Sequence, residues 1–246
     1  MVRLAALLLV AAASLGCEYI AGYDDGRVLG PSTELESVTC QCGDPDCGDC
    51  PDTVVVALPG FSIDETEVTV EAYLGFVDAD LDAQKKTHKQ PNRCSENATF
   101  RPETQPLDPR MAASFVDWCD AYAFCEWRHA HLCGKMGGGT LAEAERGDPT
   151  VDEWFNACTG GSVTDPGDAD PQCRSVEDFD VPLAHCHRGG GDYGKVYDLV
   201  GAVMELGDTQ FLDARGSDGD VSVGCGLTAR VEPLDAYGNI GFRCCQ

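Results

Sequence analysis

Four cysteines within a short acidic segment are the first residues of this chain that could carry out chemistry. Cys40, Cys42, Cys47 and Cys50 fall within eleven residues, and the Cys47-x-x-Cys50 half has the spacing of zinc ligands. The Cys40-x-Cys42 half is tighter than a usual zinc knuckle. Exported cysteines normally oxidise, so we favour two local disulfides over a zinc site.

Two histidine pairs suggest a second metal site. They read His129-x-His131 and His185-Cys186-His187. Short histidine pairs are common without metal, and nothing else in the sequence converges on these two. We therefore expect no metal here, and an enzyme using His185, His187 and nearby carboxylates is kept as the alternative. No Ser-His-Asp order, Walker loop or dinucleotide fingerprint supports another reaction class.

The charge of the chain limits its partners. Forty-two acidic residues against 17 basic ones give 246 residues a net charge of -25. Such a charge repels phosphate backbones and anionic membrane surfaces, which excludes nucleic acid as a partner. Contact with a membrane is expected only through a lipid anchor.

The N-terminus is typical of an export signal. Arg3 supplies the positive end, and Leu4–Leu15 is an apolar run too short to span a bilayer. The run ends in Ser14-Leu15-Gly16-Cys17, which resembles a bacterial lipobox with Ser where Leu is usual. The alternative is ordinary cleavage after one of the alanines at 11–13.

Cysteine parity favours lipidation of Cys17. The chain has 15 cysteines, and an acylated Cys17 leaves 14 that can pair in an oxidising compartment. We therefore expect a signal peptide at 1–16, a lipid-anchored Cys- and Asp-rich stalk at 17–52 and a domain at 53–246. The expected location is the bacterial cell envelope, in the periplasm or at the outer membrane.

Periodicity predicts few regular elements. Residues 53–58 form a β-branched run closed by Pro59-Gly60, which predicts a strand and a turn. Thr69 can cap a helix whose apolar face is Val70, Tyr73, Leu74 and Val77. A second helix is expected near Asp120, a short one at 152–158, and a long loop at 78–110. After Thr159 we expect loops and short strands.

Four phrases in fixed order connect the chain to a known family. They are WCDAYAFCEW at 118–127, EWFNAC at 153–158, VYDLVGAVME at 196–205 and NIGFRC at 239–244. Together they resemble the formylglycine-generating enzyme, or sulfatase-modifying factor, family. The resemblance implies an α+β fold with little regular secondary structure, related to C-type-lectin-like domains and rich in disulfides.

The resemblance also implies that the catalytic thiols are missing. The family's two copper-binding cysteines lie ten and five positions before the cysteine that aligns with Cys225, where this chain has Arg215 and Asp220. No cysteine occurs between Cys186 and Cys225, so a shifted alignment cannot supply them. Neither guanidinium nor carboxylate replaces a thiolate for soft Cu(I), so copper is not expected.

Two disulfides are implied by the same resemblance, Cys125 with Cys244 and Cys158 with Cys225. Proximity alone suggests Cys173 with Cys186. The four remaining cysteines of the domain, Cys94, Cys119, Cys133 and Cys245, must form disulfides with one another. A disulfide between the adjacent Cys244 and Cys245 would be strained and is therefore disfavoured.

Other positions are interpreted from the same alignment. A family calcium site uses a phrase in which this chain keeps Glu205 but has Ala202 in place of an asparagine, which indicates that calcium binding is lost or weakened. Arg215 could bind an anion, but beside so many acids we expect a solvated charge. Gly216 is expected at positive φ. Arg243 is expected to make buried polar contacts.

These observations predict a non-catalytic binding or interaction lipoprotein that holds a peptide, glycan or protein partner. The alternatives are a divergent enzyme that uses other residues, either an oxidase of the family type or another metal-dependent oxygenase, and a purely structural envelope protein. Function has to be argued from the site, because one fold hosts many activities.

Overall fold

The computed structural model describes residues 40–79, 90–102, 104–106, 108–163, 189–216 and 221–246. These residues belong to one compact unit, Val38–Gln246. Short helices and two small sheets alternate along it, which is the α+β class that the sequence predicts. Among the described helices, none combines the length and the apolar character needed to cross a membrane.

The first sheet joins the start, middle and end of the unit. Its strand order is β1-β2-β8-β3, and all neighbours are antiparallel. The β1–β2 hairpin turns at Gly60, whose φ of 96° suits a residue without a Cβ. The strands are β1 (Val55–Leu58), β2 (Phe61–Asp64), β3 (His131–Leu132) and β8 (Cys244–Cys245).

The second sheet carries the most deeply buried strands. Its order is β6-β5-β4-β7, with β4 and β7 parallel and the other pairs antiparallel. Every residue of β4, β5 and β7 is buried, so charged residues there must find partners inside the protein. The strands are β4 (Met204–Leu206), β5 (Asp213–Arg215), β6 (Thr228–Arg230) and β7 (Ile240–Phe242).

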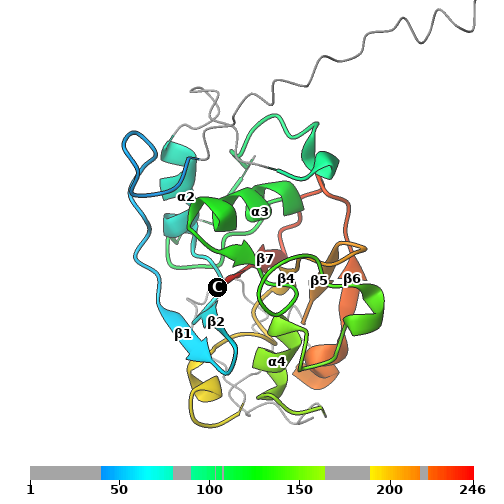
Figure 1. The fold of residues 1–246 in the computed structure, drawn as a ribbon. Coiled ribbons are helices and arrows are strands. Elements are labelled where there is room, and N and C mark those ends of the chain that lie inside the picture. The colour runs from blue at the N-terminus through cyan, green and yellow to red at the C-terminus, as the bar shows by residue number, and fades with distance from the viewer. Residues whose placement is uncertain (1–39, 80–89, 103, 107, 164–188, 217–220) are drawn as a thin grey trace, which may run out of the picture. The chain divides into compact units, whose positions relative to one another are not determined.

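Three α-helices begin at side-chain caps. α2 (Val70–Asp78) starts where Thr69 Oγ1 accepts the Ala72 N–H at 3.2 Å. α3 (Trp118–Trp127) and α4 (Glu153–Thr159) start at aspartates whose carboxylates accept backbone N–H groups. In Figure 1, α2 and α3 lie above β4–β7 and α4 lies below. Short 3₁₀ helices occur at Asn92–Cys94, Glu143–Glu145, Tyr193–Lys195 and Val221–Gly226.

α2 and α3 meet in an aromatic core. The ring centroids of neighbouring pairs lie 5.3–6.0 Å apart, within the range of favourable ring contacts. The predicted apolar face of α2 is buried except for Leu74, which is partly exposed. The rings belong to Tyr73, Phe76, Phe124, Trp127 and Phe242.

Strand β8 divides the interior into two hydrophobic clusters. Successive residues of a strand point to opposite faces of the sheet, so the side chains of Cys244 and Cys245 face different clusters. Cys244 lies in the cluster with Cys125 and bonds to it, whereas Cys245 lies in the other cluster and bonds to Cys133. This geometry explains why the two adjacent cysteines have separate partners.

The described residues contain six disulfides. Both pairs implied by the family resemblance, Cys125–Cys244 and Cys158–Cys225, are present. The remaining bonds are Cys133–Cys245, Cys94–Cys119, Cys40–Cys47 and Cys42–Cys50. Cys173 and Cys186 lie outside the described residues, as does Cys17.

The cysteine-rich segment before β1 packs onto α3. Trp127 Nε1 donates to the Cys47 carbonyl at 2.7 Å, and the Cys42 N–H donates to the Trp127 carbonyl at 2.9 Å. Cys40, Cys42 and Cys47 are buried. The segment 40–52 therefore packs as part of the compact unit. The domain start that we expected at residue 53 did not include this segment, and its hydrogen bonds to Trp127 are the reason for the difference.

Candidate functional site

Arg215, at the position of the first expected catalytic cysteine, lies inside the protein. Its side chain is 2% exposed, and its Nη1 donates to Asp152 Oδ1 at 2.6 Å. Its guanidinium carbon lies 5.9 Å from the centroid of the Trp154 ring. Strand β5 is a central strand with three buried residues, so Arg215 points toward α4 rather than into water. The prediction that Arg215 is a solvated charge is wrong.

The Arg215 guanidinium is only partly satisfied. Within the described residues, its Nε and Nη2 groups have no hydrogen-bond partner. The next residue, Gly216, has a φ of 80°, as predicted, and a Cβ there would lie 2.6 Å from the Leu199 carbonyl oxygen. Asp220, the second expected catalytic position, lies outside the described residues.

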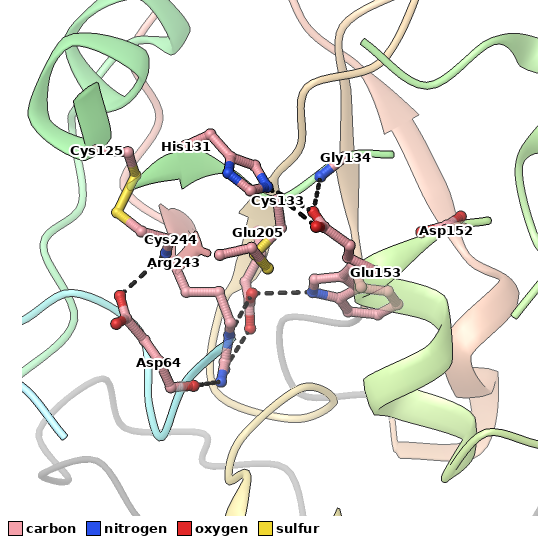
Figure 2. The surroundings of a disulfide bond; sticks show 12 residues. Asp64, Cys125, His131, Cys133, Gly134, Asp152, Glu153, Glu205, Arg243 and Cys244 are labelled. Atoms are coloured by element: carbon pink, nitrogen blue, oxygen red, sulfur yellow. Dashed lines mark hydrogen bonds and ion pairs between the residues drawn. A yellow bond between two sulfur atoms is a disulfide. The ribbon is translucent and has the colours of Figure 1, made fainter. Parts of the chain in front are cut away.

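Glu205 and Arg243 form a second buried pair (Figure 2). Arg243 Nη2 donates to Glu205 Oε1 at 2.6 Å, and its Nε donates to Oε2 at 2.7 Å. Trp154 Nε1 donates to the same Oε2 at 2.9 Å. Burial lowers the pKa of Arg243, but Glu205 and Glu67 outweigh that effect, so its pKa is raised and it stays charged. The expected buried contacts of Arg243 are thus present.

Glu67 is a buried carboxyl that the sequence did not single out. It is 1% exposed, and neither side-chain oxygen has a hydrogen-bond partner within the described residues. Arg243 Nη2 lies 3.4 Å from Glu67 Oε2. Burial raises the pKa of Glu67 well above 4.5, and the negative charges of Glu205 and Asp198 raise it further. In the sequence, Glu67 lies in residues 61–69, a stretch that resembles the opening strand of the family, but no role was assigned to it.

The described residues that were weighed as possible metal ligands do not fit a metal site. Both oxygens of Glu205 accept from protein donors, and the adjacent Arg243 repels a cation, so a calcium site built on Glu205 does not fit. The six disulfides hold all twelve described cysteines, so this part of the chain has no thiolate pair for copper. The same bonds exclude zinc at Cys42, Cys50 and His129, although these side chains lie close together.

The histidines of the first pair have different partners. His131 Nε2 lies 2.9 Å from Glu153 Oε2, and Glu153 also accepts from the Gly134 N–H at 3.0 Å (Figure 2). His129 Nε2 lies 3.2 Å from the Cys42 carbonyl oxygen. His131 is thus an oriented side chain beside a buried carboxylate, and it does not converge with His129. His185 and His187 lie outside the described residues.

A groove with a volume of about 450 Å³ lies away from these buried pairs. It is formed by the segment after Cys94, the start of α3 and the loop that precedes β7. Four of its lining residues are acidic and two are aromatic. Burial and the nearby charge of Asp235 raise the pKa of Asp117. These acidic and aromatic lining residues are Glu96, Asp117, Asp120, Asp235, Phe115 and Tyr237.

Comparison with known proteins finds one family model that matches the whole of the compact unit. A family model described as a sulfatase-modifying factor enzyme 1-like domain matches residues 31–246. A search of curated proteins found no significant match.

Three similar solved structures illustrate the likeness. CarF is 17% identical, covering 81% of this chain and 95% of its own, with a TM-score of 0.45. Treponema denticola variable protein 1 is 18% identical, covering 75% and 84%, with a TM-score of 0.43. PvdO from Pseudomonas aeruginosa is 20% identical, covering 75% and 79%, with a TM-score of 0.45.

Proposed function

The chain belongs to the sulfatase-modifying factor (FGE-sulfatase) family, and from that premise we propose that it is a non-catalytic binding module of an exported lipoprotein. In this proposal the fold is retained as a scaffold, and the oxidase chemistry of the family is lost. The partner is a peptide, a glycan or a protein.

The observation that carries the proposal is the side chain at the first catalytic position. Arg215 is buried between Asp152 and Trp154, where it stabilises the junction of β5 with α4. A thiolate at this position would leave the buried carboxylate of Asp152 without its cation. The side chain at position 215 therefore has a structural role. This supports a loss of catalysis rather than a rearranged copper site.

An aldehyde-forming assay tests the proposal. The purified protein, with its disulfides intact, is incubated with Cu(I), oxygen and a cysteine-containing sulfatase peptide, and mass spectrometry follows the conversion of cysteine to formylglycine. We expect no conversion, while an active member of the family converts the same peptide. Turnover comparable to that of the active enzyme would overturn the proposal.

The exported, lipid-anchored part of the proposal rests on cysteine chemistry. Six disulfides use twelve of the 15 cysteines, and they favour an oxidising compartment. If Cys173 pairs with Cys186, Cys17 is left over at the end of the lipobox-like sequence. Labelling with a palmitate analogue tests this. We expect labelling of the wild type and none of Cys17→Ser, and equal labelling of both would contradict it.

A further inference from the structure

We propose that the disulfide between Cys42 and Cys50 is a redox-controlled zinc site. In the oxidised protein its sulfurs are bonded to each other and cannot bind a metal. Once an external dithiol has reduced the bond, the two thiolates and the His129 imidazole form a set of three zinc ligands. This inference goes beyond the proposed binding function and does not depend on it.

Cys50 is the cysteine that an external thiol can reach. It is exposed, whereas every other described cysteine is buried. Thiol–disulfide exchange requires access to a sulfur, and exposed disulfides are among the most easily reduced. Among the disulfides of the described residues, we therefore expect the Cys42–Cys50 bond to open first.

The three ligand atoms already lie together. The sulfurs of Cys42 and Cys50 and a ring nitrogen of His129 are all within 4.8 Å of one another. Tetrahedral zinc, with bonds of about 2.3 Å to sulfur and about 2.0 Å to nitrogen, needs ligand atoms roughly 3.5–3.8 Å apart. Rotation of the two cysteine side chains, which is free once the bond has opened, brings the atoms to these distances.

His129 is held against this bond by its backbone. It follows the C-cap of α3 and has a φ of 58°, a left-handed conformation that few residues other than glycine adopt. Its Nε2 lies 3.2 Å from the Cys42 carbonyl oxygen. A metal-binding histidine usually donates one ring N–H to such a carbonyl, which orients the ring and keeps the lone pair of the other nitrogen for the metal. The contact is therefore of the kind that a histidine ligand needs.

Other bonds hold the loop in place when the Cys42–Cys50 bond opens. The Cys40–Cys47 disulfide, whose cysteines are both buried, closes the same loop separately. Trp127 Nε1 donates to the Cys47 carbonyl, and the Cys42 N–H donates to the Trp127 carbonyl, so the segment stays attached to α3. Ligands that are held in position before the metal arrives lose less entropy on binding. Reduction should thus free the ligands without unfolding the segment.

The redox step balances with a dithiol as the reductant. One of its thiolates attacks Cys50 Sγ, the S–S bond breaks, and Cys42 leaves as a thiolate while a mixed disulfide forms at Cys50. The second thiolate of the reductant then attacks the reductant's own sulfur in that mixed disulfide, which releases Cys50 and leaves the reductant as a disulfide. The two protons of the dithiol go to solvent, because zinc keeps both cysteines deprotonated. Thiolate and imidazole ligands suit zinc, whereas calcium and magnesium prefer oxygen.

Mild reduction of the full protein tests the first step. Treatment with a low concentration of dithiothreitol is followed by alkylation and peptide mass spectrometry. Cys42 and Cys50 should be alkylated about ten-fold or more faster than any other described cysteine, because reduction needs access to a sulfur. Earlier or equally fast opening of another of the six disulfides would overturn the proposal.

Zinc analysis tests the second step. The reduced protein is separated from the reductant under nitrogen, incubated with zinc and dialysed, and its metal content is measured. We expect a gain of about one zinc per chain over the oxidised protein. Cys42→Ser/Cys50→Ser, treated in the same way, should gain none, which excludes binding by the other cysteines. Equal gain by this variant, or no gain by the wild type, would also overturn the proposal.

Two histidine variants locate the third ligand. His129→Gln should weaken zinc binding about ten-fold or more, since even a residue that only orients a ligand is worth that much. His131→Gln removes a nearby histidine whose partner is Glu153 and should leave zinc binding unchanged. Cobalt(II) in place of zinc gives a visible thiolate band that reports the ligands directly, and thermal unfolding shows whether each variant folds. Equal weakening by both variants would show that His129 is not a ligand.

Discussion

Carboxylates lie in two different settings in this molecule. In the core, Asp64, Asp152 and Glu205 are buried, and each accepts hydrogen bonds from a buried arginine. Around the groove, Glu96 and Asp235 are exposed, and neither forms an ion pair with another described residue; Arg101, which also lines the groove, pairs with Asp78. The comparison teaches that the same residue type supports the fold through buried ion pairs in one place and stays hydrated at the surface in the other.

The difference follows from the cost of burying charge. A buried carboxylate loses its hydration, so it is tolerated only with a cation and hydrogen bonds close by. An exposed carboxylate keeps its water, and a surface partner adds little stability. Core acids should therefore affect stability strongly when changed, and groove acids should affect it little.

The largest effect is expected from Arg243→Met. The change leaves Glu205 and Glu67 buried without their cation, and breaking such a pair costs about 3–5 kcal/mol. Urea unfolding measures it. Arg110→Met, which removes an exposed partner of Asp108, is the control and should change stability much less. Similar losses of unfolding free energy in both variants would contradict the conclusion that buried ion pairs matter more to stability than exposed ones.

A smaller loss is expected from Arg215→Met. Asp152 would lose its ion pair, but Arg215 already has two unpaired donors within the described residues, so we expect about 2–3 kcal/mol. Adding Asp152→Asn should recover part of it, because the amide oxygen can still cap α4. Urea unfolding of the single and double variants checks this, and no recovery would contradict the buried-charge explanation.

Glu67→Gln should alter the pH dependence of stability. Burial raises the pKa of Glu67 in the folded state, so folded protein holds this proton when unfolded chain has lost it. The contribution of Glu67 to the free energy of unfolding is therefore fully present below about pH 4.5. It is lost as the pH rises from there to the pKa that Glu67 has in the folded protein. The variant should show a shallower fall in unfolding free energy from pH 4.5 upward. The exposed Glu71→Gln should keep the slope of the wild type.

The smallest effect on stability is expected in the groove. Glu96→Gln/Asp235→Asn should change the unfolding free energy by within about 0.5 kcal/mol, because exposed changes away from caps and buried contacts rarely do more. Relief of repulsion favours a slight gain. Thermal unfolding at low salt measures it. A loss as large as that of Arg243→Met would show that these acids are structural.

Local features of the fold were predictable from the sequence. The cap at Thr69, the positive φ of Gly216 and the buried Arg243 followed from residue type and local pattern. The disulfides Cys125–Cys244 and Cys158–Cys225 followed from the family resemblance and are present. Caps and turns depend on a few neighbouring residues, which is why a sequence can reveal them.

The setting of the charges was not predictable. Arg215 looked exposed because its sequence neighbours are acidic, but its partner Asp152 lies 63 positions away. The groove was missed because its walls come from three separated segments. The segment 40–52 looked like a stalk until its contacts with Trp127 placed it on α3.

By itself the sequence determined the fold class, the family and the lack of cysteines at the catalytic positions, because these depend on which residues are present and in what order. Only the tertiary structure decided which acids are buried with arginines and which face water. That choice depends on long-range packing, and packing sets both the hydration of a carboxylate and the distance to its nearest cation.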